Sequence, residues 1–208
     1  MNDKLSSLCA EFTTRLASPA PVPGGGGAAA LCASLSAALV SMAGELSLGK
    51  KSTAAHTEEL AALKAAAKEK AGRFLALIDA DAAAFEPLSR AYSIPRDKAG
   101  REAVLSAASI TAASAPVDML RECLDLTALL ERMADICSRL MLSDVGCAAA
   151  LCRAAAECAA MNVYVNLPGI SDAETVEEYR READRLLAAC RETAGNLAER
   201  IMNDMKEP

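Results

Sequence analysis

The chain has 208 residues and a formal net charge of −6, with 22 Lys and Arg against 28 Asp and Glu. This acidic balance disfavours a nucleic-acid partner, because such binding depends on neutralising phosphates. Alanine accounts for 47 residues, whereas the aromatic residues make up only 3% of the chain. Ala is the best helix former and is depleted in strands, so the composition predicts an all-α fold and argues against all-β and α/β architectures.

The eight cysteines and the single histidine exclude several kinds of site. No two cysteines form a CxxC pair, and with His56 alone a zinc site is not expected. The N-terminus has no basic region followed by an apolar core, as a signal peptide would have. We therefore expect reduced, small, buried thiols in a cytoplasmic protein, and a surface position for His56 at the start of a helix.

The first predicted helix starts near Asp3, which can serve as its N-cap, and stops at the segment from Ser18 to Pro23. Three alternating prolines between residues 18 and 23 then impose an extended segment. An apolar helix follows over residues 28–48, with Gly49 as its C-terminal stop. This helix is long enough to cross a membrane, but it carries Glu45 and four serines, so we expect a central buried helix and no membrane partner.

Two long helical patterns follow, each containing one proline. The first covers residues 53–92, and Pro87 is expected to kink or break its end. The second covers residues 98–142, where Pro116 predicts either two helices or one strongly bent helix.

The C-terminal part of the chain predicts two more helices. Ser143-Asp144 offers a cap for an Ala- and Cys-rich helix over residues 143–166, and Ser171 or Asp172 offers a cap for the last amphipathic helix. Short connections favour antiparallel neighbours. The sequence therefore predicts one domain over residues 1–208, an antiparallel bundle of about six to seven helices, several of them long and kinked.

The most unusual local feature is the glycine run Gly24, Gly25, Gly26 and Gly27 at the start of an apolar helix. Glycines allow a ligand to approach the backbone closely, and the first free N–H groups of a helix can bind an anion. The run lacks the Gly-Lys-Ser/Thr ending and the preceding strand of a P-loop. A close helix–helix crossing without side chains explains the pattern equally well, so both interpretations stay open.

A second candidate is the pair Asp79 and Asp81, which lies among Ala, Ile and Phe residues. Residues spaced i, i+2 on a helix point about 200° apart, so the two carboxylates cannot act together. One of them should face water. If the other faces the bundle, burial raises its pKa and suits it to proton transfer. Two solvated charges are the alternative.

Further polar candidates lie on the other helices. Asn162 and Asn166 share one helix face, which indicates either a network between helices or an amide-rich ligand. Lys50 and Lys51 could meet an anionic ligand, although lysine pairs usually face solvent. Asp144 either caps its helix or belongs to the same site.

These segments together resemble one known family. The sequences PGGGGAAA (23–30), LGKK (48–51), IDADAAAF (78–85), SD (143–144) and NVYVNL (162–167) are similar, in order and spacing, to those of the formiminotransferase-cyclodeaminase C-terminal family. The resemblance covers residues 5 to 197, and five motifs in register make it specific. The family includes stand-alone bacterial methenyltetrahydrofolate cyclohydrolases.

The resemblance implies an all-helical homodimer that acts on one-carbon tetrahydrofolates without a metal or redox cofactor. It places the catalytic acid at Asp81. Lys50 or Lys51 would hold the glutamate carboxylates of the substrate, Gly24–Gly27 would lie against the flat ligand, and Asn162, Asn166 and Asp144 would bind pterin amide groups or fix the site. Pterin stacking would fall to one of the few aromatic residues, Phe85, Tyr92 or Tyr164.

The resemblance leaves two reactions and one non-enzymatic alternative. A cyclohydrolase opens 5,10-methenyltetrahydrofolate with water to 10-formyltetrahydrofolate, whereas a cyclodeaminase closes 5-formiminotetrahydrofolate with loss of ammonia. The absence of a formiminotransferase domain from this sequence favours the cyclohydrolase. The chain departs from the family at Gly27, where Ser is frequent, and at residues 139–142, where Gly-Asn or Pro-Asn is common. A helical dimerisation scaffold without activity is the third possibility.

Overall fold

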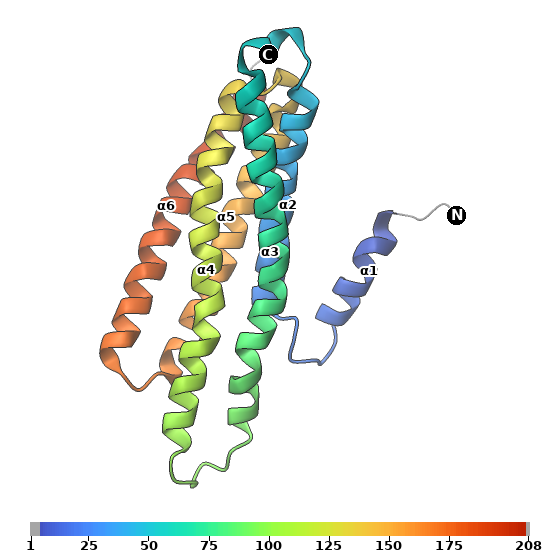
Figure 1. Ribbon diagram of the computed structural model, residues 1–208. Helices are drawn as coiled ribbons and strands as arrows, with labels where there is room; N and C mark the ends of the chain where they lie inside the picture. Colours follow the sequence, from blue (N-terminus) through green and yellow to red (C-terminus); the bar gives the residue numbers. More distant parts are fainter. Residues whose placement is uncertain (1–4, 207–208) are drawn as a thin grey trace.

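Long antiparallel helices build most of the molecule, as the alanine content predicts. A computed structural model describes residues 5–206, and Figure 1 shows most of the helices side by side in a bundle. The six α-helices are α1 (Leu5–Leu16), α2 (Gly25–Ser47), α3 (Thr57–Tyr92), α4 (Arg101–Ile136), α5 (Leu142–Tyr164) and α6 (Ala173–Lys206). Three short 3-10 helices connect them: η1 (Lys51–His56), η2 (Arg139–Met141) and η3 (Leu167–Gly169). No strand occurs among residues 5–206, so the all-α prediction is confirmed.

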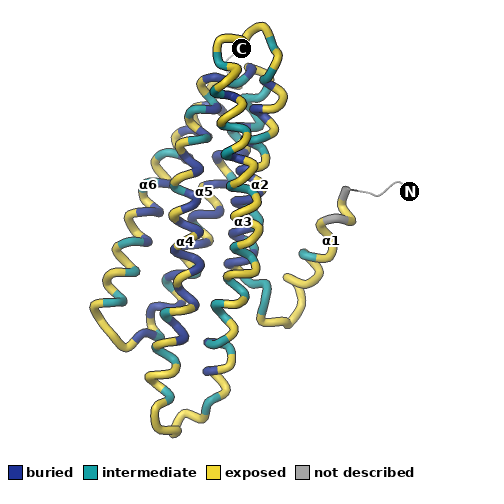
Figure 2. The backbone as a smooth tube through the Cα atoms, in the orientation of Figure 1, coloured by how far each residue is buried: buried dark blue, intermediate teal, exposed yellow. Residues whose placement is uncertain are grey.

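The core lies around α2, which packs mainly against α3 and α5. Most of the buried side chains of α2 are Ala, Gly or Ser, so neighbouring backbones come close. The hydroxyl of Ser36, for example, donates a hydrogen bond of 2.7 Å to the Ala148 carbonyl of α5. Larger side chains such as Phe74 and Leu120 fill the wider parts of the bundle, and Figure 2 shows the buried residues gathered in its interior.

The paired helices α3 and α4 extend beyond the ends of α2, α5 and α6 and form a projecting hairpin (Figure 1). A small second core, centred on Leu88, Ala91 and Ala108, packs the two helices together there. The hairpin is also tied to the segment after α5, because Ser106 Oγ accepts a hydrogen bond of 2.9 Å from the Ser171 N–H.

Both prolines lie inside continuous helices. The helix α3 continues for five residues beyond Pro87, and α4 runs through Pro116 without a break. Of the two alternatives predicted for this segment, the division into two helices at Pro116 is therefore wrong, and one helix spans it. A proline removes one N–H donor from a helix, and the packing of a 36-residue helix against several neighbours outweighs that loss.

The predicted helix ends are confirmed at some positions and wrong at others. Gly49 adopts a left-handed conformation (φ 74°) just after α2, and Asp172 Oδ2 accepts the Thr175 N–H at 2.9 Å at the start of α6. Ser143-Asp144, by contrast, does not cap α5, which begins at Leu142 directly after η2 and has no side-chain cap. The cap expected at Asp3 lies outside the described residues.

The thiols are only partly buried. All eight cysteines are free; Cys123, Cys152 and Cys190 are buried, Cys32 and Cys137 are partly buried, and Cys9, Cys147 and Cys158 are exposed. The expectation of buried thiols is therefore wrong for the last three, which lie on outer helix faces. His56 sits at the end of η1 with its side chain 41% exposed, as expected.

Two helices, α2 and α4, are long and apolar enough to cross a membrane by length and composition alone. About half of the most apolar window of each helix is buried inside the bundle, 56% and 50% respectively. The central position of α2 agrees with the expected core helix.

Candidate functional site

The N-terminus of α2 packs closely against α3 and the end of α5. Gly24 is the N-cap of α2, and Gly25, Gly26 and Gly27 form its first turn. A Cβ atom at Gly26 would lie only 2.2 Å from Oδ1 of Asp81. A Cβ atom at Gly25 would lie 3.1 Å from Nδ2 of Asn162. The glycines therefore make room for polar side chains of two other helices.

The Asp81 carboxylate occupies the position of an anion bound at a helix N-terminus. It accepts a hydrogen bond from the Gly27 backbone N–H, one of the donors that the first turn of a helix leaves unpaired. Partial burial raises the pKa of the Asp81 carboxyl above its ordinary value of 3.8, and the Gly27 N–H opposes that rise. The result is a carboxylate in weakly solvated surroundings, whose proton affinity is higher than that of a surface Asp.

The two asparagines come from the C-terminal end of α5 and the turn that follows. Asn162 Nδ2 donates to the Cys158 carbonyl, and Asn166 Nδ2 donates to the Asn162 carbonyl, each at 2.8 Å. Asn166 is buried and Asn162 is partly buried. Because their own helix anchors both amide groups, the side chains are held in fixed positions beside the glycine turn.

These groups line one cavity of about 210 Å³. Its polar lining comes from Asp81, Asn162 and Asn166 and from the backbone of the glycine turn, and its apolar walls are Pro21, Val22, Phe85, Ala112, Pro116 and Val165. Small-molecule pockets usually measure about 300–1,000 Å³, so this cavity has room for part of a ligand rather than for a whole large one.

The remaining candidates lie elsewhere. Lys50 and Lys51 follow the C-terminus of α2, a helix of 23 residues, which places them about 35 Å from the glycine turn. Lys50 Nζ donates to Ser138 Oγ at 3.2 Å. Asp144 lies in the first turn of α5, about 27 Å along that helix from Asn162. Within one chain, then, these three residues do not share the cavity of Asp81.

Sequence reasoning identified the polar groups of the cavity but not all of its walls. Asp79 is exposed, as expected for the partner of Asp81 on the opposite helix face. Phe85 is the aromatic residue in the lining, whereas Tyr164 donates to Asp184 of α6 at 2.6 Å and lies outside it. The sequence did not predict that Pro116 and Val165 line the cavity. A proline inside a helical pattern predicts a helix break, and a single valine has no feature that indicates a binding site.

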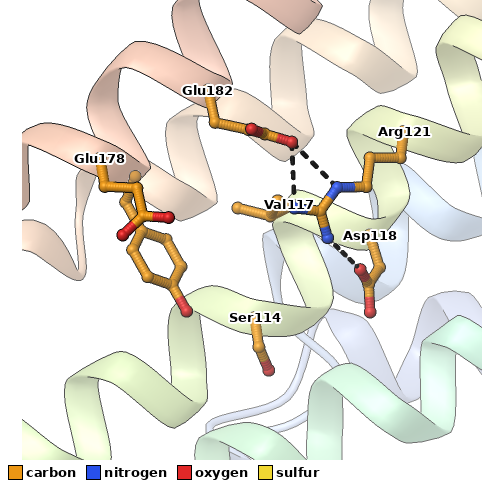
Figure 3. Close-up of a pocket in the computed structure, with 7 residues that line it drawn as sticks. Ser114, Val117, Asp118, Arg121, Glu178 and Glu182 are labelled. Carbon is orange, nitrogen blue, oxygen red and sulfur yellow. Dashed lines mark hydrogen bonds and ion pairs between the residues drawn. The ribbon is translucent and has the colours of Figure 1, made fainter. Parts of the chain in front are cut away.

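A different cavity, of about 150 Å³, lies between α4 and α6 (Figure 3). Its cation, Arg121, already binds Asp118 and Glu182 at 2.9 and 3.0 Å, and both carboxylates raise its pKa. Because Arg121 is already paired and the lining carries three carboxylates, Asp118, Glu178 and Glu182, against this one cation, the cavity is less suited to an anionic ligand than the cavity at Asp81. Among residues 5–206, no group of three or more His, Cys, Asp or Glu side chains is arranged to hold a metal ion.

Comparison with known proteins places the chain in a family. The model of the family described as formiminotransferase-cyclodeaminase matches residues 8–185. A methenyltetrahydrofolate cyclohydrolase of Methylorubrum extorquens is 38% identical over 202 residues, which cover 94% of each chain. The formimidoyltransferase-cyclodeaminase of Sus scrofa is 27% identical over 195 residues, and the match covers 91% of this chain but 36% of that protein.

A solved structure agrees with these relatives. The formiminotetrahydrofolate cyclodeaminase of Thermotoga maritima superposes with a TM-score of 0.80 at 28% identity, covering 93% of this chain and 96% of that one. The chain therefore belongs to the formiminotransferase-cyclodeaminase family.

Proposed function

We propose that this protein is a methenyltetrahydrofolate cyclohydrolase, which opens 5,10-methenyltetrahydrofolate with water to give 10-formyltetrahydrofolate. The observation that carries the proposal is the position of Asp81, a partly buried carboxylate against the first turn of α2, in one cavity with two anchored asparagines. The cyclohydrolase of M. extorquens, which this chain matches over nearly its full length, supports the choice of reaction.

The reaction needs one group that stabilises a positive charge on the substrate and accepts a proton from water. The methenyl carbon lies between two nitrogens of an amidinium-like cation, which an adjacent carboxylate stabilises. As water adds to this carbon, Asp81 accepts the proton that the water loses. The hydroxyl group formed on this carbon then loses its proton to become the formyl oxygen, while the carbon–nitrogen bond to N5 breaks and N5 takes up a proton. The formyl group stays on N10, and one proton is released overall. The raised pKa of the Asp81 carboxyl makes it a better proton acceptor than a surface Asp.

The other cavity groups orient the substrate. The amides of Asn162 and Asn166 complement the donors and acceptors of a pterin ring, and Phe85 supplies an aromatic surface for stacking. The glycine turn allows the flat ring to approach the backbone of α2. No metal or redox cofactor has a role in this scheme.

The decisive experiment follows the absorbance of the methenyl group with purified protein. The proposal expects 5,10-methenyltetrahydrofolate to disappear faster than in buffer alone. Formation of the methenyl compound from 5-formiminotetrahydrofolate, with no hydrolysis, would instead support a cyclodeaminase, the activity named for the T. maritima structure. If neither substrate reacts, the protein is a helical scaffold and the proposal is wrong.

The quaternary structure proposed is a homodimer. The outer face of α2 is apolar along its length, with Leu35, Met42 and Leu46 exposed by 51%, 38% and 47%, and Glu45 is the one charged residue of this helix. At the end of the neighbouring α5, Met161 and the C-cap residue Val165 are exposed by 63% and 71%. Exposed apolar faces of this extent are typical of interfaces, and a second copy is the partner that presents the same face.

A dimer could also bring Lys50, Lys51 and Asp144 near the cavity of Asp81 in the second protomer. If two α2 helices pack antiparallel, the C-terminal end of one lies near the glycine turn of the other. The lysines would then reach the substrate only from the second protomer. We place the dimer in the cytoplasm, since all eight thiols are unpaired.

A further inference from the structure

The helix α1 stands apart from the bundle, on the side away from α6 (Figure 1). Among the residues of α1 whose exposure is described, Phe12 alone is partly shielded, and the others are exposed. Phe12 lies against the start of α2, since its Cζ atom is 4.0 Å from the position that a Cβ atom would take at Gly27. A helix of 12 residues is only marginally stable in water without a packing partner, so α1 needs more surface than this contact provides.

The sequence of α1 gives this helix one apolar side. Successive apolar residues are spaced three or four positions apart, which places them along one side of the helix: Leu5, Leu8, Cys9, Phe12 and Leu16. Of these, Cys9 is exposed and Leu16 is 36% exposed. The charged residues Glu11 and Arg15 lie outside this side. An apolar side of this kind is normally buried against another element.

The connection between α1 and α2 is stiff and forms part of the site. Three alternating prolines between residues 18 and 23 hold it extended. Its residues Pro21 and Val22 line the cavity of Asp81. Phe12 lies against Gly27, whose N–H binds the Asp81 carboxylate. The position of α1 therefore affects both a wall of the cavity and the helix turn that binds Asp81.

The dimer proposed above needs more surface than α2 alone offers. The helix α2 has 23 residues and is about 35 Å long, and a helix is about 10 Å wide, so its outer face covers about 350 Å². A stable interface buries about 800 Å² per partner, more than twice that area. The neighbouring α5 adds an exposed apolar strip that includes Cys158 and Met161. With Leu35, Met42 and Leu46 of α2, this strip forms the α2–α5 face.

A second copy suits α1 better than its own bundle does. Within its own chain α1 touches the start of α2 through Phe12, which leaves Cys9 and Leu16 uncovered. Two copies that meet through α2 bring the α1 helix of each one beside the α2–α5 face of the other. Both surfaces are poor in charge, since Glu45 is the one charged residue of α2, and such surfaces suit the apolar centre of an interface.

We infer that α1 of each chain packs on the α2–α5 face of a second copy, so that the two copies exchange their N-terminal helices and thereby fix the wall of each Asp81 cavity. The inference rests on the dimer proposed above. It adds that dissociation lowers activity, because Pro21, Val22 and Gly27 then lose the support of a bound α1. Packing of α1 on its own bundle is the alternative.

A photo-cross-link identifies the surface that α1 touches. Replacing Cys9, on the apolar side of α1, with the photoreactive residue p-benzoylphenylalanine should give a covalent product of twice the chain mass of 21.6 kDa after irradiation. The same replacement at Thr14, which is exposed on the opposite side, is the control and should give little of that product. A cross-linked product of single-chain mass from position 9 would place α1 on its own bundle and overturn the inference.

Charged substitutions test whether the contact supports the dimer and the site. The double variant Cys9→Glu, Leu16→Glu would bury two unpaired charges and should raise the dissociation constant of the dimer at least about tenfold. Its turnover per chain should fall on dilution and return at high protein concentration, which a folding defect would not do. The matched control Ala10→Glu, Thr14→Glu adds the same charge to the opposite, exposed side of α1 and should keep the wild-type dissociation constant and turnover.

Three further results would overturn the inference: a dimer without a cross-link between chains from position 9, equal dissociation constants for the two double variants, or a turnover per chain that does not change as the dimer dissociates. A monomeric wild type would contradict the proposed dimer as well. The cross-link and the dissociation constants do not depend on catalysis, so they test the exchange of α1 even if the protein proves unable to hydrolyse methenyltetrahydrofolate.

Discussion

Gly26 and Asp81 are matched to each other: the space that a side chain would occupy at Gly26 is filled by the carboxylate of Asp81, whose Oδ1 lies 2.2 Å from that Cβ position. The next residue, Gly27, donates its backbone N–H to the same carboxylate. Close helix packing, one of the two interpretations of the glycine run, therefore accounts for Gly26, and the approach of a ligand to this backbone stays a prediction. The helices cross closely, and the close crossing places a carboxylate at a helix N-terminus.

The first prediction concerns this contact. Gly26→Ala should displace the Asp81 carboxylate and lower turnover by about 100-fold, the usual effect of moving a catalytic group by about 1 Å. Overpacking should also lower the free energy of unfolding by about 1–3 kcal/mol. Steady-state kinetics and urea unfolding measure the two effects.

Gly72→Ala is the matched control for Gly26→Ala. Nothing lies within 4 Å of the Cβ position of Gly72, which is exposed in the middle of α3. The substitution should therefore raise the free energy of unfolding by about 0.5–1 kcal/mol, through helix propensity alone. Equal kinetic effects of the two substitutions would contradict the role assigned to the Gly26–Asp81 contact.

The second prediction separates the two aspartates. Asp81→Asn keeps the shape and removes the charge, so turnover should fall by at least about 100-fold, the contribution expected of a general base. Asp79→Asn changes an exposed carboxylate two residues away and should leave turnover within about twofold. Circular dichroism should show the same helix content for both variants. Similar, small losses in both would rule out Asp81 as the catalytic group.

Local rules sufficed to predict most of the helices and to single out three polar residues that line the cavity, Asp81, Asn162 and Asn166, although the choice of Asp81 over Asp79 came from the family resemblance. Spacing alone predicted that Asp79 and Asp81 point apart, and the structure exposes one and partly buries the other. Spacing likewise predicted that Asn162 and Asn166 share a face, and both line the cavity.

The sequence could not show which predicted site residues lie close together in space and which lie at opposite ends of a helix. Lys50 and Gly25 belong to neighbouring motifs, yet α2 separates them by about 35 Å. From the sequence, Pro116 predicts a helix break. Only the tertiary packing reveals that α4 continues through Pro116 and that this residue forms part of the cavity wall. Both facts depend on contacts between distant parts of the chain.

The third prediction concerns stability and pH. Since the pKa of the Asp81 carboxyl is raised by burial, the folded protein keeps this proton at pH values where the unfolded chain has already lost it. The folded state then binds more protons than the unfolded state, so the free energy of unfolding falls as pH rises through the pKa of the folded form. Asp81→Asn removes this dependence.

Denaturant unfolding of the wild type and Asp81→Asn at a series of pH values tests this linkage. The variant should be more stable than the wild type at neutral pH, and the difference should shrink as the pH is lowered toward 3.8, the ordinary value for an aspartate. Other carboxylates contribute equally to both proteins and cancel. A difference that does not change with pH would show that Asp81 is not destabilised by its surroundings.

The fourth prediction tests the proposed dimer through the outer face of α2. Leu35 is 51% exposed on that face, and Leu75, which is 48% exposed, lies on α3 close to the charged residues Lys68 and Asp79. Leu35→Glu would bury an unpaired charge in the interface and should produce monomers, whereas Leu75→Glu should leave the dimer intact. Light scattering on a size-exclusion column distinguishes the chain mass of 21.6 kDa from twice that value. A wild-type mass of one chain, or a dimer that persists in Leu35→Glu, would contradict an interface through α2, and with it the only route by which Lys50 and Lys51 could reach the cavity of Asp81.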